Sequence, residues 1–120
     1  MEIKSEWIKN GANEDMVSFA ERCGRDLAKG NLTNSKIRSI YGEIKRIQGN
    51  KNFEKSKSSF YLLKPKVAYA YGREPRNEGL RLFKEIFDNA SKLVTDENSF
   101  NNFCDFMEAI LAYHRAFGGK

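Results

Sequence analysis

Long hydrophobic runs are missing from this chain of 120 residues. Its apolar runs are only a few residues long, which excludes a membrane-spanning helix, because such a helix needs about 20 mostly apolar residues. The N-terminal stretch MEIKSEWIKN also has no apolar signal region. We therefore expect a cytoplasmic protein with no membrane partner.

Residues that usually carry out chemistry are also scarce. The chain has one histidine, His114, and two cysteines, Cys23 and Cys104, without metal-ligand spacing. Helical periodicity puts all three on apolar faces, so we interpret His114 as a hydrogen-bonded packing residue and the two thiols as buried. No glycine-rich phosphate loop or hydrolase motif is present. These absences predict a protein that is not an enzyme and has no metal site and no cofactor.

Strand signals are absent as well. Apolar residues recur at spacings of three and four, and the alternation typical of strands is missing. This pattern predicts an all-α fold in one domain, residues 1–120, built as a compact bundle of about five helices. A turn around Trp7 and Ile8 can add a short extra helix at the N-terminus.

The expected helices have recognisable starts and stops, such as the N-cap Asn13 and the terminal Gly118 and Gly119. They cover residues 13–30, 33–49, about 60–72 and about 77–94, and a last helix starts at Asp96 or Asn98 and runs to residue 117. Pro65 disfavours helical geometry at the residue before it, so the third helix either kinks or starts there. Residues 50–59 are polar, and we expect a loop or a frayed turn. In the last helix we expect Phe117 to point inward.

Positive charge is confined to one block of the chain. Residues 33–81 hold twelve Lys or Arg and four acids, a net charge of +8, whereas residues 1–32 carry −1 and residues 82–120 carry −2. A basic block of this kind favours one functional face that binds an anionic polymer such as nucleic acid.

Two stripes within this block are the candidate contact surface. In the second helix Arg38, Gly42 and Lys45 share a face, with Arg46 farther round. In the third helix the stretch LLKPKVAYAYGR interleaves lysines and arginine with tyrosines, and its residues 66, 69 and 73 share a face. Cations neutralise phosphates and aromatic rings stack on bases. We expect the two stripes to converge into one outward-facing basic track.

Three blocks also resemble a known family: TNSKIRSIYGEIKR, LLKPKVAYAYGR and the terminal EAILAYHRAFGG. In this order they are similar to the small subunit of type III-A CRISPR effector complexes, the Csm system, and the similarity covers most of residues 13–119. The charge stripes and the positions that match the family pattern together identify seven candidate RNA-binding residues: Arg38, Lys45, Arg46, Lys64, Lys66, Tyr69 and Arg73.

The resemblance implies an all-helical, non-catalytic subunit. Copies of it would stack along the complex and bind the backbone of target RNA paired to guide RNA without sequence specificity. The implied partners are therefore that RNA, other copies of the chain and the other subunits of the complex. Whether the isolated protein forms a homodimer stays open.

Two other classes of function remain open. The first is a stand-alone helical DNA-binding protein that places its second or third helix in a major groove. Pro65 interrupts the candidate reading helix, and the basic stripes hold few Asn or Gln residues to read bases, which counts against this class. The second is a scaffold subunit whose basic face docks on an acidic protein partner.

Overall fold

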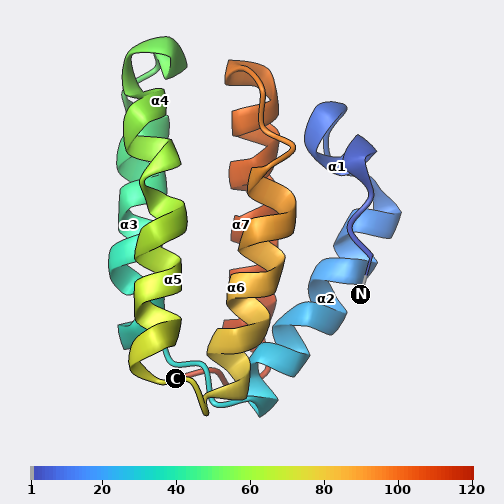
Figure 1. The fold of residues 1–120 in the computed structure, drawn as a ribbon. Coiled ribbons are helices and arrows are strands. Elements are labelled where there is room, and N and C mark those ends of the chain that lie inside the picture. The colour runs from blue at the N-terminus through green and yellow to red at the C-terminus, as the bar shows by residue number, and fades with distance from the viewer. Residues whose placement is uncertain (1) are drawn as a thin grey trace.

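The computed structural model describes residues 2–120, which form seven helices and no strand (Figure 1). The helices are α1 (Ser5–Lys9), α2 (Glu14–Lys29), α3 (Asn34–Gly49), α4 (Phe53–Tyr61), α5 (Leu63–Arg73), α6 (Glu78–Ser91) and α7 (Glu97–Ala116). Helices α6 and α7 stand in the middle of the molecule, with α3, α4 and α5 on one side and α1 and α2 on the other (Figure 1). The prediction of an all-α bundle is confirmed.

Helices α2 and α7 cross in close contact. The side chain of Asn13 accepts a hydrogen bond from the amide of Met16, as expected for the cap of α2. Farther along, a Cβ atom on Gly24 would lie 2.5 Å from the Cβ of Tyr113 and 2.6 Å from the backbone nitrogen of His114. The two backbones can approach this closely only because residue 24 has no side chain.

The core is rich in phenylalanine. Five of these side chains are almost fully buried, and they come from α6 and α7: Phe83, Phe87, Phe100, Phe103 and Phe106. The ring of Phe100 stacks on Phe53 with centroids 5.0 Å apart and meets Phe60 edge-on at 5.3 Å. Aromatic packing thus joins α4 to α7.

His114, in the last turn of α7, is fully buried. Its Nε2 lies 2.7 Å from the carbonyl oxygen of Leu32, and because a carbonyl only accepts, Nε2–H is the donor. This bond ties α7 to the connection between α2 and α3. The interpretation of His114 as a hydrogen-bonded packing residue is confirmed.

The expectation of a loop at residues 50–59 is wrong, because α4 begins at Phe53. The side chain of Asn52 accepts a hydrogen bond from the amide of Lys55, and the amide of Phe53 donates to Glu97 Oε1 at 3.1 Å. Phe53, Ser56 and Phe60 form the buried face of this helix. A single narrow apolar face is therefore enough to hold an otherwise polar helix.

Pro65 starts a helix and does not kink one. Helix α4 ends at Tyr61 and α5 begins at Leu63, so Pro65 lies in the first turn of α5. Amides in the first turn have no intrahelical partner, so a proline there removes no hydrogen bond. The structure therefore supports the interpretation in which a helix starts at Pro65 and not the one in which a helix kinks there.

Phe117 does not point into the core, which corrects the expected inward orientation. It is the C-cap of α7 and its side chain is 40% exposed. Its ring stacks on Tyr113, and the guanidinium of Arg25 lies 4.7 Å from the ring centroid. The helix ends here because Gly118 adopts a positive φ of 90°, as the glycine pair predicted.

Candidate nucleic-acid interface

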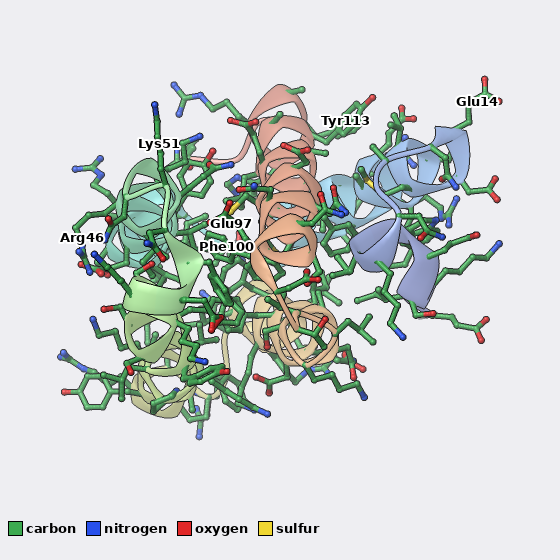
Figure 2. The ribbon with its side chains drawn as sticks, turned by 90° about the horizontal axis from the view of Figure 1, so that it is seen from above. Glu14, Arg46, Lys51, Glu97, Phe100 and Tyr113 are labelled. Carbon is green, nitrogen blue, oxygen red and sulfur yellow. The ribbon has the colours of Figure 1, made fainter. Side chains whose placement is uncertain are left out.

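All seven candidate residues are exposed and lie on α3 and α5. Their helices form the side of the molecule opposite α1 and α2 (Figure 1). Seen from above, Arg46 of α3 reaches outward at one edge and Glu14 of α2 lies at the other (Figure 2). The candidate residues therefore share one side of the bundle, although they do not share one groove.

The groove between α3 and α5 brings three of the candidates together. Lys66, Tyr69 and Arg73 line it from α5, and Lys36 and Ser39 line it from α3. We call it the α3/α5 groove; it encloses about 730 Å³. Because residues 66, 69 and 73 lie one turn apart on a helix, their side chains follow the length of the groove.

Arg38 lies in a different groove, on the other flank of α3. This α3/α7 groove encloses about 520 Å³ and is lined from α3 by Arg38, Tyr41 and Gly42 and from α7 by Glu108 and Arg115, among other residues. The exposed Gly42 has nothing within 4 Å of the position of a Cβ atom. The surface at Gly42 is therefore open.

Lys45 is tied to the α7 side of α3. Its Nζ lies 3.6 Å from Glu108 Oε1, the same oxygen that accepts a hydrogen bond from the hydroxyl of Tyr41 at 3.2 Å. Burial first, and then the charge of Glu108, raise the pKa of Tyr41 to about 12. Tyr41 therefore stays protonated as a donor, and Lys45 already has a carboxylate partner.

Arg46 and Lys64 fall outside both grooves. The guanidinium of Arg46 donates two hydrogen bonds to Glu43 Oε2, at 2.8 and 3.2 Å. This hydrogen bonding holds the pKa of Glu43 below its ordinary value, with a smaller contribution from the charge of Lys66. Lys64 lines a third groove with Tyr61 and Lys92, between α5 and α6.

The expectation of one continuous basic track is therefore wrong. The two sequence stripes lie on opposite flanks of α3, because Arg38 and Lys45 face α7 while Lys66, Tyr69 and Arg73 face α3 from α5. Helix α3 is a ridge between two grooves, and cations line both. The periodicity of α3 correctly grouped Arg38 with Lys45, but the position of its neighbours decides which way that stripe faces.

Ion pairing divides the candidates further. Within residues 2–120, four candidate cations have no carboxylate within 4 Å, namely Arg38, Lys64, Lys66 and Arg73. Lys45 and Arg46 have partners, but these pairs are exposed and weak. The unpaired cations are the ones that can neutralise a phosphate without first losing a carboxylate.

The candidate set from the sequence omitted Lys36, Ser39 and Arg115, which are among the polar residues that line the two grooves. Lys36 and Ser39 lie on the α5 flank of α3, where Lys36 forms an ion pair with Glu74. Arg115 lies in the α3/α7 groove. Lys36 and Ser39 are three residues apart and on the flank opposite Arg38, so a helical projection finds them once α5 is known to pack there.

No other kind of site emerges from the part of the chain that the structure describes. Residues 2–120 contain no group of three His, Cys, Asp or Glu side chains that could hold a metal ion. Burial raises the pKa of Cys23 and of Cys104 to about 12, so neither thiol is a nucleophile at neutral pH. No described helix is both long enough and apolar enough to span a bilayer.

The described residues form an all-helical fold in which cations line grooves on both flanks of α3. The Csm2 Type III-A family model matches residues 10–120. A curated relative, the CRISPR system Cms protein Csm2 of Streptococcus thermophilus, is 30% identical over an alignment of 116 residues that covers 90% of this chain and 95% of the relative. No solved structure matches the chain.

The chain therefore belongs to the Csm2 Type III-A family. The family match spans all three of the sequence blocks that resembled the small subunit of the type III-A CRISPR effector complex. That resemblance is confirmed.

Proposed function

We propose that this chain is the non-catalytic small subunit of a type III-A CRISPR complex and binds the backbone of target RNA along α3 and α5. In this proposal copies stack along the complex and contact target RNA that is paired to guide RNA. Membership of the Csm2 Type III-A family supports the place in the complex. The exposed cations on α3 and α5 support the RNA contact.

The observation that carries the RNA contact is the set of unpaired cations on one side of the bundle. Arg38 lines the groove on one flank of α3, and Lys66 and Arg73 line the groove on the other flank. Exposed guanidinium and ammonium groups bind phosphate oxygens irrespective of base sequence. A complex that accepts any guide requires this property, because base pairing to the guide carries the sequence information.

Binding by one copy is expected to be weak and sensitive to salt. If each copy neutralises about four phosphates of a single strand, log affinity falls with log salt concentration at a slope of roughly −3. Several copies aligned on one RNA make each later contact intramolecular, which raises the overall affinity. Nanomolar binding by the free protein that persists in high salt would count against this account.

Charge reversal tests the proposal. We expect Lys66→Glu combined with Arg73→Glu to weaken binding of target RNA to the reconstituted complex by tenfold or more and to make its salt slope shallower by about 1.4 for each affected copy. Both side chains are exposed and have no carboxylate partner, so the fold should survive. Fluorescence anisotropy across a salt series measures the binding, and size-exclusion chromatography measures the assembly.

Lys9→Glu combined with Arg22→Glu is the matched control, because it changes the net charge by the same amount as the double variant. Both residues are exposed cations, on α1 and α2, at the other side of the molecule. The control should assemble and bind RNA like the unaltered protein. Equal losses for the control and for the double variant would mean that net charge, and not the α5 side, is responsible, and would refute the proposed interface.

Docking of the same side on an acidic protein partner is the second candidate function. It is favoured by Tyr61 and Leu62, adjacent residues at the junction of α4 and α5 that are each 59% exposed. Large exposed apolar side chains are typical of protein contacts. In the charge-reversal experiment, failed assembly would support docking, whereas intact assembly with lost RNA binding would support the RNA contact.

A further inference from the structure

The α3/α5 groove has an apolar floor that phosphate binding does not explain. Ile40, Ala70 and Leu80 line it together with the cations. Its volume of about 730 Å³ lies within the range of small-molecule sites. A surface that bound only phosphates would need cations and hydrogen-bond donors but no apolar recess beside them.

Tyr69 is the most exposed large hydrophobic side chain of the described residues, at 68%. It lines the groove, and no other aromatic ring among residues 2–120 stacks against it. The guanidinium carbon of Arg73 lies 5.9 Å from its ring centroid. The ring is therefore held beside a cation while it remains available to a planar ligand.

The charges of the groove are divided along its length. Lys66 and Arg73 are unpaired and lie about two turns apart on α5, on either side of Tyr69. At the Arg73 end Glu74 forms an ion pair with Lys36 across the groove, which neutralises the only lining carboxylate. The arrangement is therefore a tyrosine ring flanked by two free cations.

We infer that the α3/α5 groove binds one unstacked RNA nucleobase, with Tyr69 as the stacking surface and with Lys66 and Arg73 on the flanking phosphates. Aromatic side chains stack on any base, so this contact does not read sequence. Bases inside a continuous duplex are stacked on each other and cannot enter the groove. The inference rests on the proposed function and narrows its ligand from a phosphate backbone to a target strand in which at least one base is neither paired to the guide nor stacked on its neighbours.

The test compares three tyrosine variants on two ligands. The full-length protein carries Tyr69→Ala, Tyr69→Phe or the control Tyr61→Ala, whose tyrosine is similarly exposed at 59% but lines a different groove. The ligands are a single-stranded uridine oligomer and an abasic oligomer with the same number of phosphates. Heteronuclear NMR titration at low salt measures even weak dissociation constants and also reports whether each variant is folded.

We expect Tyr69→Ala to weaken binding of the uridine oligomer by about fivefold to a hundredfold, which corresponds to the loss of one stacked base. The slope of log affinity against log salt concentration should not change, because no phosphate contact is removed. Tyr69→Phe and Tyr61→Ala should bind like the unaltered protein. On the abasic oligomer, Tyr69→Ala and the unaltered protein should bind equally.

The inference is overturned if Tyr69→Ala binds the uridine oligomer as the unaltered protein does, or if it loses the same affinity for the abasic oligomer. Lys66→Glu with Arg73→Glu separates this failure from failure of the proposed function. If that double variant loses affinity while Tyr69→Ala does not, phosphate binding stands without a base site. If the double variant also binds normally, the proposed interface itself is wrong.

Discussion

Two glycines show how differently the two sides of the bundle are built. At Gly24, on α2, an added Cβ would overlap the backbone of α7, whereas at Gly42, on α3, nothing lies within 4 Å of that position. Helices α2 and α7 meet at Gly24 in direct backbone contact, and the groove on the α1/α2 side holds three carboxylates, Glu2, Asp15 and Asp26, beside two cations. The α3 side is bordered on both flanks by open, cation-lined grooves. The comparison teaches that the two sides of the molecule differ in how closely their helices meet and in the charge of their grooves.

The charges follow the same division. The basic block, residues 33–81, contains α3, α4 and α5, whereas residues 1–32, which contain α1 and α2, carry a net charge of −1. The Lys and Arg side chains of the basic block cluster outside the core, so they do not weaken its packing. We therefore expect mutations on the two sides of the bundle to have different effects.

The largest effect is expected from adding one methyl group to the α2 side. Gly24→Ala should lower the free energy of unfolding by about 1–3 kcal/mol or more, because the overlapping atoms belong to the backbone of α7 and cannot move aside easily. Gly42→Ala is the matched variant in α3. It should leave stability unchanged or raise it by up to about 1 kcal/mol, since alanine is the better helix former.

Chemical denaturation of both variants measures this difference directly. The contrast between the two sides would be broken if Gly42→Ala destabilised the protein as much as Gly24→Ala. It would also be broken if Gly24→Ala were neutral, because the α2–α7 crossing would then have more space than the structure contains.

A smaller effect is expected at the cap of α7. The carboxylate of Asp96 accepts hydrogen bonds from the amide and from the hydroxyl of Ser99, both at 2.8 Å. The backbone hydrogen bond first, and the hydroxyl second, hold the pKa of Asp96 below its ordinary value of 3.8. Asp96→Ala should lower the midpoint of thermal unfolding by a few degrees at neutral pH.

The pH dependence of the Asp96 effect has a definite sign. Because the folded state lowers this pKa, the stabilisation is fully present above the unfolded pKa and is lost as the pH falls through the folded one. The difference in the midpoint of thermal unfolding between Asp96→Ala and the unaltered protein should therefore shrink below about pH 4. Asp96→Asn keeps an acceptor and should lose this pH dependence. A gap that widened in acid would contradict the assignment of the cap.

The smallest effect is expected when the native protein is treated with a thiol reagent. Cys23 and Cys104 are 5% and 4% exposed, and burial raises the pKa of each from 9.0 to about 12. Neither should react with a thiol reagent at pH 8 until the protein is unfolded. Because these pKa values are raised, their contribution to stability is present below pH 9 and should be lost as the pH rises toward 12. Fast native labelling would contradict the burial.

Much of the fold could be predicted because the caps and the apolar periodicity agree. Asn13 starts α2 and the Gly118–Gly119 pair ends α7, as the sequence indicated, and of the two candidate starts of α7 the structure has Asp96. These signals are local, so they need no knowledge of neighbouring helices. The burial of His114 was also predictable, since it shares a face with the apolar residues of α7.

Features that depend on tertiary contacts could not be predicted. Helix α4 is polar in composition, and it is held by Phe53 and Phe60 against α7 and by the bond from Phe53 to Glu97. Likewise, the stripe of Arg38 and Lys45 was found correctly, but its direction depends on α7. Periodicity tells which residues share a face and does not tell what that face meets.

Photocrosslinking of target RNA within the assembled complex, with the linked peptides identified by mass spectrometry, tests the central claim most directly. RNA substituted with 4-thiouridine should link to peptides from α3 and α5, including the one that contains Tyr69. Crosslinks that fall mainly on α1 and α2 would show that the RNA follows the other side of the bundle and would contradict the account.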